Sequence, residues 1–156
     1  MRPAIDHIEI TVADLDRAER FYDALLPLLG FDLKHKGRGE FPAWEHTEID
    51  YGTAEFSLGL VCPRPALAGE GVCRRKPGSL HHLAFRAESA QQVDALYLAV
   101  LSIPGVTVVA PPQLYPEYTP DYYAFFFKDT EGIKLEIVHF DRPACYPDTK
   151  KPPEGA

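Results

Sequence analysis

Two stretches of the chain, "HIEITVADLDRAERFYDALLPLLGF" at residues 7–31 and "HLAFRAESAQQVDALYLAVLSIPGV" at residues 82–106, decide the fold because they align without a gap. Every aligned pair is 75 residues apart, as His7 is from His82 and Gly30 is from Gly105. Few residues are identical, but the apolar pattern matches throughout. A constant offset over so long a stretch indicates an internal repeat.

Each copy predicts a strand followed by a helix. Apolar and polar residues alternate over residues 7–11 and again over residues 82–86, which is typical of strands with one buried face. The first helix is predicted to begin after an Asp14 N-cap, and the second after Ser89, which forms a capping box with Gln92. Gly30 and Gly105 are predicted to end the two helices.

Three further strands are predicted to complete each copy. They lie at residues 31–36, 44–50 and 54–61 in the first half and at residues 106–110, 122–128 and 133–140 in the second. The chain is thus predicted to be α+β, a single domain at residues 1–140 made of two β-α-β-β-β modules. The modules cover residues 4–62 and 79–140, a Pro- and Gly-rich linker covers 63–78, and a Pro-rich tail covers 141–156.

Composition narrows the class of protein. The 156 residues are enough for one packed core, and the net charge of −7 argues against nucleic acid or an anionic membrane as a partner. No apolar run has the length of a membrane span, and the N-terminal stretch lacks the apolar segment of a signal peptide, so a cytoplasmic location is expected. The three cysteines show no Cys-x-x-Cys spacing, which argues against a cysteine zinc site.

The histidine doublet His81–His82 in "GSLHHLAF" raises a question of roles. Neighbouring strand residues point to opposite faces, so the two imidazoles cannot do the same work. His82 aligns with His7 on the polar face, whereas His81 aligns with Asp6 and is expected only to pack or cap. In the last strand, Glu136 is predicted to lie on the face away from the helix.

His7, His82 and Glu136 are therefore the candidate metal ligands. Two imidazoles and a carboxylate suit a borderline divalent ion such as zinc, nickel, iron(II) or manganese. Three protein ligands leave coordination positions open for water or substrate, which is the catalytic rather than the structural arrangement. The alternative is that these residues bind no metal and that the same surface only binds a ligand.

Three motifs carry a family resemblance: "DHIEI" at 6–10, "HHLAF" at 81–85 and "FKDTEGIKLEIV" at 127–138. Together with the repeat, they resemble the vicinal oxygen chelate superfamily, which includes glyoxalase I, fosfomycin-resistance thiol transferases, extradiol dioxygenases and bleomycin-resistance proteins. The resemblance covers roughly residues 4–140. It implies a cupped, eight-stranded mixed sheet and a homodimer. Thr130 and Glu131 replace the Pro and Asp that the family usually has there.

The resemblance implies the same ligands, His7, His82 and Glu136. The fourth ligand of glyoxalase I, a Glu on the last strand of the first half, falls on or near Ser57, and serine is a poor ligand for these ions. Glu55 shares the face of Ser57 if that strand is regular. A three-ligand site, as in the thiol transferases and dioxygenases of the family, fits the sequence better.

The implied function is that of a metal-dependent enzyme acting on a small molecule whose adjacent oxygens the ion chelates, by lyase or isomerase, thiol transferase or dioxygenase chemistry. The segment "YPEYTPDYY" at residues 115–123 supplies the candidate catalytic residues Glu117, Tyr122 and Tyr123, of which at most one tyrosine should enter a cavity. Plain aromatic packing is an equally good interpretation of this segment. The alternative function is a non-catalytic protein that sequesters an antibiotic, as bleomycin-resistance proteins do.

Overall fold

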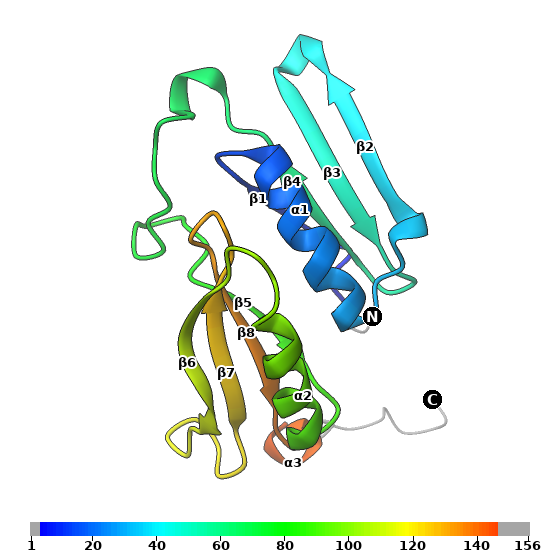
Figure 1. Ribbon diagram of the computed structural model, residues 1–156. Coiled ribbons are helices and arrows are strands. Elements are labelled where there is room, and N and C mark those ends of the chain that lie inside the picture. The colour runs from blue at the N-terminus through cyan, green and yellow to red at the C-terminus, as the bar shows by residue number, and fades with distance from the viewer. Residues whose placement is uncertain (1–3, 147–156) are drawn as a thin grey trace, which may run out of the picture.

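The computed structural model describes residues 4–146, which form two four-stranded mixed sheets of identical topology (Figure 1). The first sheet has the strand order β1-β4-β3-β2, and the second sheet has the order β5-β8-β7-β6. The strands are β1 (His7–Thr11), β2 (Lys36–Phe41), β3 (His46–Gly52), β4 (Ser57–Val61), β5 (Leu83–Arg86), β6 (Thr107–Leu114), β7 (Tyr123–Lys128) and β8 (Lys134–His139). In each sheet the first strand pairs in parallel with the last, and the remaining pairs are antiparallel. The predicted β-α-β-β-β repeat is confirmed, as two sheets rather than one continuous sheet.

The two long helices begin and end at equivalent positions. Helix α1 is Leu15–Leu25 and helix α2 is Ala90–Val100, so both ends differ by the repeat offset. The Asp14 side chain accepts a hydrogen bond from the Arg17 amide, and Ser89 Oγ accepts one from the Gln92 amide at 3.1 Å. Both predicted N-caps are confirmed. A short helix, α3 (Arg142–Cys145), follows β8, and no helix among residues 4–146 is long and apolar enough to cross a membrane.

The second strand of the first sheet differs from its prediction. Residues 31–36 were expected to form it, but Asp32 accepts a hydrogen bond from the Lys34 amide and starts a 3-10 turn, η2 (Leu33–His35). Phe31 is buried in the core, and the strand begins only at Lys36. Its sequence, "KGRGEF", has two glycines, which lower strand propensity, so its formation depends on pairing with β3.

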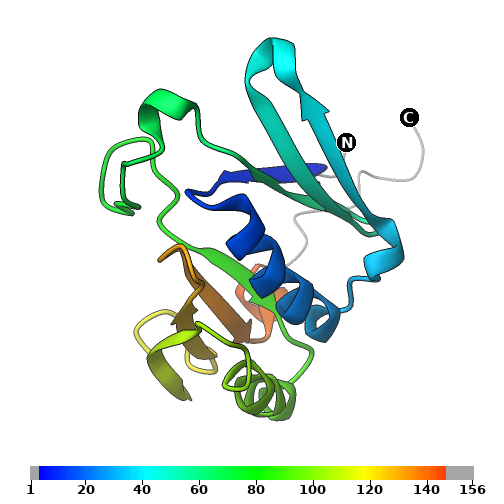
Figure 2. The same cartoon turned by 45° about the horizontal axis from the view of Figure 1, so that its top comes forward.

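One hydrophobic core joins the two halves. The buried face of α1 packs on the first sheet through residues such as Phe21 and Leu25, and α2 packs on the second sheet through Val93 and Val100. Residues of both modules belong to the same cluster. Figure 2 shows α1 lying between the β2–β3 hairpin and the second module. Each sheet therefore has one face covered by a helix and one face free of helices.

The turn between β7 and β8 fixes the second module against α1. Glu131 accepts hydrogen bonds from the amides of Ala13 and Asp14 at 2.8 and 3.1 Å, and from Arg17 Nε at 2.7 Å. Its side chain is fully buried. A carboxylate at a helix N-terminus satisfies amides that have no partner within the helix. Glu131 therefore supplies a polar contact between the modules, next to the buried hydrogen bond of 2.9 Å that the Tyr22 hydroxyl donates to Asp129 Oδ2.

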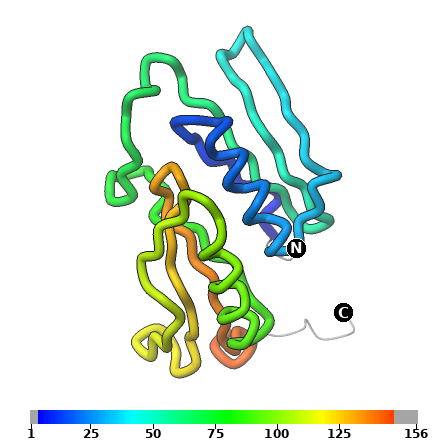
Figure 3. Tube along the Cα trace, in the orientation of Figure 1, coloured from blue at the N-terminus to red at the C-terminus, as the bar shows by residue number. Residues whose placement is uncertain are grey.

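The linker at residues 63–78 contains one 3-10 turn, η4 (Pro65–Leu67), and no helix or strand. Figure 3 shows it running along one side of the molecule from the first module to the second. Of the predicted tail at 141–156, residues 147–156 lie outside the described part of the chain.

The predicted helix ends are wrong, since α1 ends at Leu25 and α2 at Val100, each five residues before its glycine. A 3-10 turn, η1 (Leu26–Leu29), follows α1, and Gly30 caps that turn. The two glycines still provide a matched test of backbone strain. Gly30 and Gly105 have φ values of 92° and 84°, where an L side chain is strained. A Cβ at Gly105 would lie 2.5 Å from Thr130 Cγ2, whereas one at Gly30 would meet no atom within 4 Å. We expect Gly30→Ala to lower the free energy of unfolding by about 1 kcal/mol and Gly105→Ala by about 2–3 kcal/mol. Urea unfolding measures the loss of stability in each variant. Equal losses would show that the Thr130 side chain moves aside without an energetic cost.

Candidate metal centre

His82 and Glu136 meet on the helix-free face of the second sheet. His82 lies immediately before β5, and Ala84 on that strand pairs with Glu136 on β8. His82 Nε2 is 3.0 Å from Glu136 Oε2. The Glu136 side chain is 1% exposed, while that of His82 is 34% exposed. The pair thus combines a buried carboxylate with an imidazole that opens to solvent.

A second donor also reaches this carboxylate. The Tyr122 hydroxyl donates a hydrogen bond of 2.6 Å to Glu136 Oε1. Burial and the neighbouring carboxylate raise the pKa of Tyr122, so the phenol stays protonated and keeps donating. Each oxygen of Glu136 therefore has its own partner, which holds the carboxylate in one orientation.

Two consecutive hydrogen bonds orient the His82 ring through its Nδ1 atom. Arg74 Nη1 lies 3.0 Å from His81 Nε2, and His81 Nδ1 lies 2.7 Å from His82 Nδ1. Arginine only donates, so His81 Nε2 accepts and its Nδ1–H donates to His82 Nδ1. His82 then presents its Nε2–H to Glu136. A metal ion that binds the same two atoms would take the place of this proton.

His7 has the same arrangement in the first sheet. Its Nδ1–H donates to Asp6 Oδ2 at 2.9 Å, which leaves Nε2 free. The hydrogen bond with Asp6 is the largest effect that raises the pKa of His7, and the negative charges of Glu9 and Asp50 raise it further. Asp6 and His81 are 75 residues apart, so the residue before each histidine holds its Nδ1. His81 therefore does more than the packing or capping expected of it.

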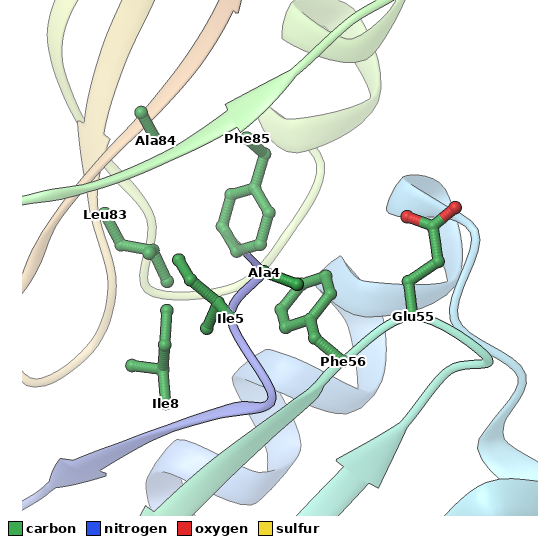
Figure 4. Close-up of a pocket in the computed structure, with 8 residues that line it drawn as sticks. All are labelled: Ala4, Ile5, Ile8, Glu55, Phe56, Leu83, Ala84 and Phe85. Carbon is green, nitrogen blue, oxygen red and sulfur yellow. The ribbon is translucent and has the colours of Figure 1, made fainter. Parts of the chain in front are cut away.

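His7 does not join His82 and Glu136 within one chain. Among residues 4–146, no three His, Cys, Asp or Glu side chains gather closely enough to hold a metal ion. The reason lies in the apolar seam between the modules, where Ile8, Leu83 and Phe85 line an open pocket of about 460 Å³. Figure 4 shows Leu83 and Phe85 pointing towards Ile8, with Ala84 pointing away. Strand alternation then directs His7 and His82 away from the seam.

The other first-half candidates are displaced from the expected position. In the second module, Glu136 pairs with Ala84. The repeat offset relates Ala84 to Glu9, and Glu9 pairs with Gly59. Ser57 instead pairs with His7. The counterpart of Glu136 is thus Gly59 rather than Ser57. Glu55 precedes β4 in a turn and lines the seam pocket, because a turn from Thr53 to Phe56 breaks the strand alternation.

The three proposed catalytic residues lie in different surroundings. Tyr122 contacts Glu136, whereas the Tyr123 hydroxyl donates to Asp94 of α2 at 2.8 Å, on the helix side of the sheet. Glu117 is exposed in the loop between β6 and β7. Of the three, the structure brings only Tyr122 to the His82–Glu136 pair.

Aromatic rings line the helix-free face of the second sheet beside Glu136. Tyr122 stacks on Phe140 with ring centroids 5.2 Å apart and meets Tyr118 edge-on at 5.1 Å. Tyr115 and His82 both contact the Phe126 ring edge-on. Lys134 Nζ lies 3.8 Å from the centroid of that ring, and burial lowers the pKa of this lysine. The face offers flat apolar surfaces next to a carboxylate and an imidazole.

Comparison with known proteins places this geometry in a family. The family model described as the Glyoxalase/Bleomycin resistance protein/Dioxygenase superfamily matches residues 4–137. An uncharacterized protein of Bacillus subtilis (strain 168), YqjT, is 33% identical over 144 residues, which cover 89% of this chain and 98% of that protein.

Solved structures agree with the family match. A putative glyoxalase from Bacillus halodurans is 27% identical, with a TM-score of 0.66 over 88% of this chain and 96% of that one. A glyoxalase/bleomycin resistance protein from Albidiferax ferrireducens T118 is 26% identical, with a TM-score of 0.62 over 86% of this chain and 98% of that one. The repeated modules and these matches lead to one conclusion: the chain belongs to the glyoxalase/bleomycin resistance protein/dioxygenase superfamily.

Proposed function

We propose that this protein is a metal-dependent enzyme that acts on a small molecule with two adjacent oxygens. The observation that carries the proposal is the His82–Glu136 pair, in which Nε2 and a carboxylate oxygen lie 3.0 Å apart. An imidazole and a carboxylate suit zinc, nickel, iron(II) or manganese. The second-sphere contacts fit as well, since metal-binding histidines usually engage their other ring nitrogen in a hydrogen bond.

The third ligand would be His7 of a second copy of the chain. Support comes from the separation of the two histidines within one chain, since Ile8, Leu83 and Phe85 point into the apolar seam and strand alternation turns His7 and His82 away from it. A twofold dimer can set the first sheet of one chain against the second sheet of its partner, and symmetry then builds two equal sites. The site would be incomplete in a single chain.

The chain's own residues have distinct parts in this proposal. His82 and Glu136 hold the ion together with the partner copy's imidazole, and Tyr122 keeps Glu136 oriented through its 2.6 Å hydrogen bond. A bound divalent ion supplies Lewis acidity towards the substrate oxygens. The aromatic rings of Tyr118 and Phe126 provide an apolar wall for the rest of the substrate.

Metal binding by the purified protein tests the proposal. We expect metal-free protein to bind about one nickel, zinc, manganese or iron(II) ion per chain in calorimetric titration, and His82→Ala to lose this binding. His35→Ala, at an exposed histidine of the first module, is the matched control and should bind as wild type does. Failure of the wild-type protein to bind any of these ions contradicts the proposal. Adducts of 2-oxoaldehydes with thiols, epoxides with thiols, and catechols with oxygen are the substrates to screen.

A specific observation also supports a second candidate function, the binding of an aromatic ligand without catalysis. Glu136 and His82 satisfy each other directly, and Tyr115, Tyr118 and Tyr122 gather beside them. A protein of this kind would bind bleomycin, the ligand in the family's name, equally well with and without metal. Calorimetry with chelator-treated protein distinguishes the two functions, because only the non-catalytic binding protein should bind the ligand as well without metal as with it. In that case Tyr118→Ala should weaken ligand binding and leave metal affinity unchanged.

A further inference from the structure

The two modules differ in where they carry a carboxylate. In the second module, Ala84 on β5 pairs with Glu136 on β8. In the first module, the equivalent pair is Glu9 on β1 and Gly59 on β4. Both pairs consist of one carboxylate and one residue with little or no side chain. The carboxylate lies on the last strand of the second module but on the first strand of the first module. The first module therefore retains an acidic residue at this pair, although its last strand has none there.

The Glu9 side chain leans over the strand that lacks a carboxylate. A Cβ built on Gly59 would lie 3.0 Å from Glu9 Cγ, and the three atoms nearest to that position all belong to Glu9. Any side chain at residue 59 would therefore push Glu9 aside. The stem of Glu9 thus fills the place on β4 that the Cβ of a residue at position 59 would occupy.

We propose that Glu9 is a fourth metal ligand, supplied with His7 by the same strand; this inference rests on the metal-dependent function proposed above. His7 and Glu9 are two residues apart on one strand face, about 7 Å between Cα atoms, which lets both side chains converge on one ion. Each module then contributes one imidazole and one carboxylate. The donor set of two nitrogens and two carboxylates suits nickel, zinc, iron(II) or manganese.

Other carboxylates on this face provide the matched controls. Asp50 on β3 also pairs with Gly59, from the opposite side, and carries the same charge. Glu48 on the same strand is already bound to His46 Nε2 at 2.7 Å. A general electrostatic attraction for cations would depend on Glu9 and Asp50 alike, whereas direct ligation depends on Glu9 alone.

Calorimetric titration of metal-free dimer with nickel is the test, with the absorption spectrum of the cobalt(II)-loaded protein as a second readout. Losing an indirect contact to a metal commonly costs 10- to 100-fold in affinity, so we expect Glu9→Gln to weaken nickel binding by about 100-fold or more and to change the cobalt spectrum. Asp50→Asn should bind within about threefold of wild type.

A double variant tests the change of strand directly. Glu9→Ala should lose affinity as Glu9→Gln does, and Glu9→Ala combined with Gly59→Glu should recover most of it, because the carboxylate returns to β4 at the equivalent of Glu136. Wild-type affinity in Glu9→Gln, with binding lost in His82→Ala, overturns this inference and leaves the proposed function standing. An equal loss in Asp50→Asn also overturns it. If wild-type protein binds no ion, both proposals fail.

Discussion

Mixing the His7→Ala and His82→Ala variants is expected to restore metal binding that neither variant shows alone. If the ligands come from two chains, a heterodimer has one site with both substitutions and one site with neither. Random pairing gives about half heterodimers, so metal content should recover to about one quarter of the wild-type value. Co-refolding the two variants, followed by metal analysis of the dimer fraction, measures this recovery.

A mixture of His82→Ala with Glu136→Gln is the control for this experiment. Both substitutions lie in the second module, and the structure brings these two residues together within one chain. Every site in the mixed dimer then lacks one ligand, so no recovery is expected. A site formed within one chain predicts no recovery in either mixture, and that result contradicts the two-chain arrangement.

The second large effect is expected from Glu131→Ala, which removes the buried polar contact of the β7–β8 turn with the N-terminus of α1. The buried carboxylate accepts hydrogen bonds from two amides and from Arg17. Their loss leaves the Ala13 and Asp14 amides without this acceptor and leaves a small cavity between the modules. We expect the free energy of unfolding to fall by about 2–3 kcal/mol, and Tm by roughly 5–10 °C.

Thermal unfolding of Glu131→Ala and Glu70→Ala measures this contribution. Glu70 forms an exposed ion pair with Lys76 at 3.7 Å, and such pairs contribute about 0–1 kcal/mol. A loss in Glu131→Ala no greater than that in Glu70→Ala would show that the Glu131 hydrogen bonds add little to the association of the modules. Metal affinity should fall as well, since the orientation of the two modules determines which faces remain available to a second chain.

Local patterns in the sequence were sufficient for most of the fold. Capping residues such as Asp14 and Ser89 fix the helix starts through hydrogen bonds from the amide three residues later. The helix ends were predicted less well, since Gly30 and Gly105 take the left-handed backbone only five residues after α1 and α2 end. Strand β2 was mispredicted because its glycine-rich sequence has weak strand propensity of its own. It forms because β3 provides backbone partners, and that pairing cannot be read from residues 36–41 alone.

The sequence by itself determined the repeat, the helix-free faces and the placing of His82 and Glu136 on one of them, because strand alternation and a constant offset are properties of neighbouring residues. Only the tertiary structure decided that His7 lies apart from this pair, that Glu131 contacts the N-terminus of α1, and that Gly59 rather than Ser57 is the counterpart of Glu136. These features depend on the packing of segments more than a hundred residues apart and on the register of parallel strands. Neither the packing nor the register can be read from neighbouring residues, because both depend on contacts between segments that are far apart in the sequence.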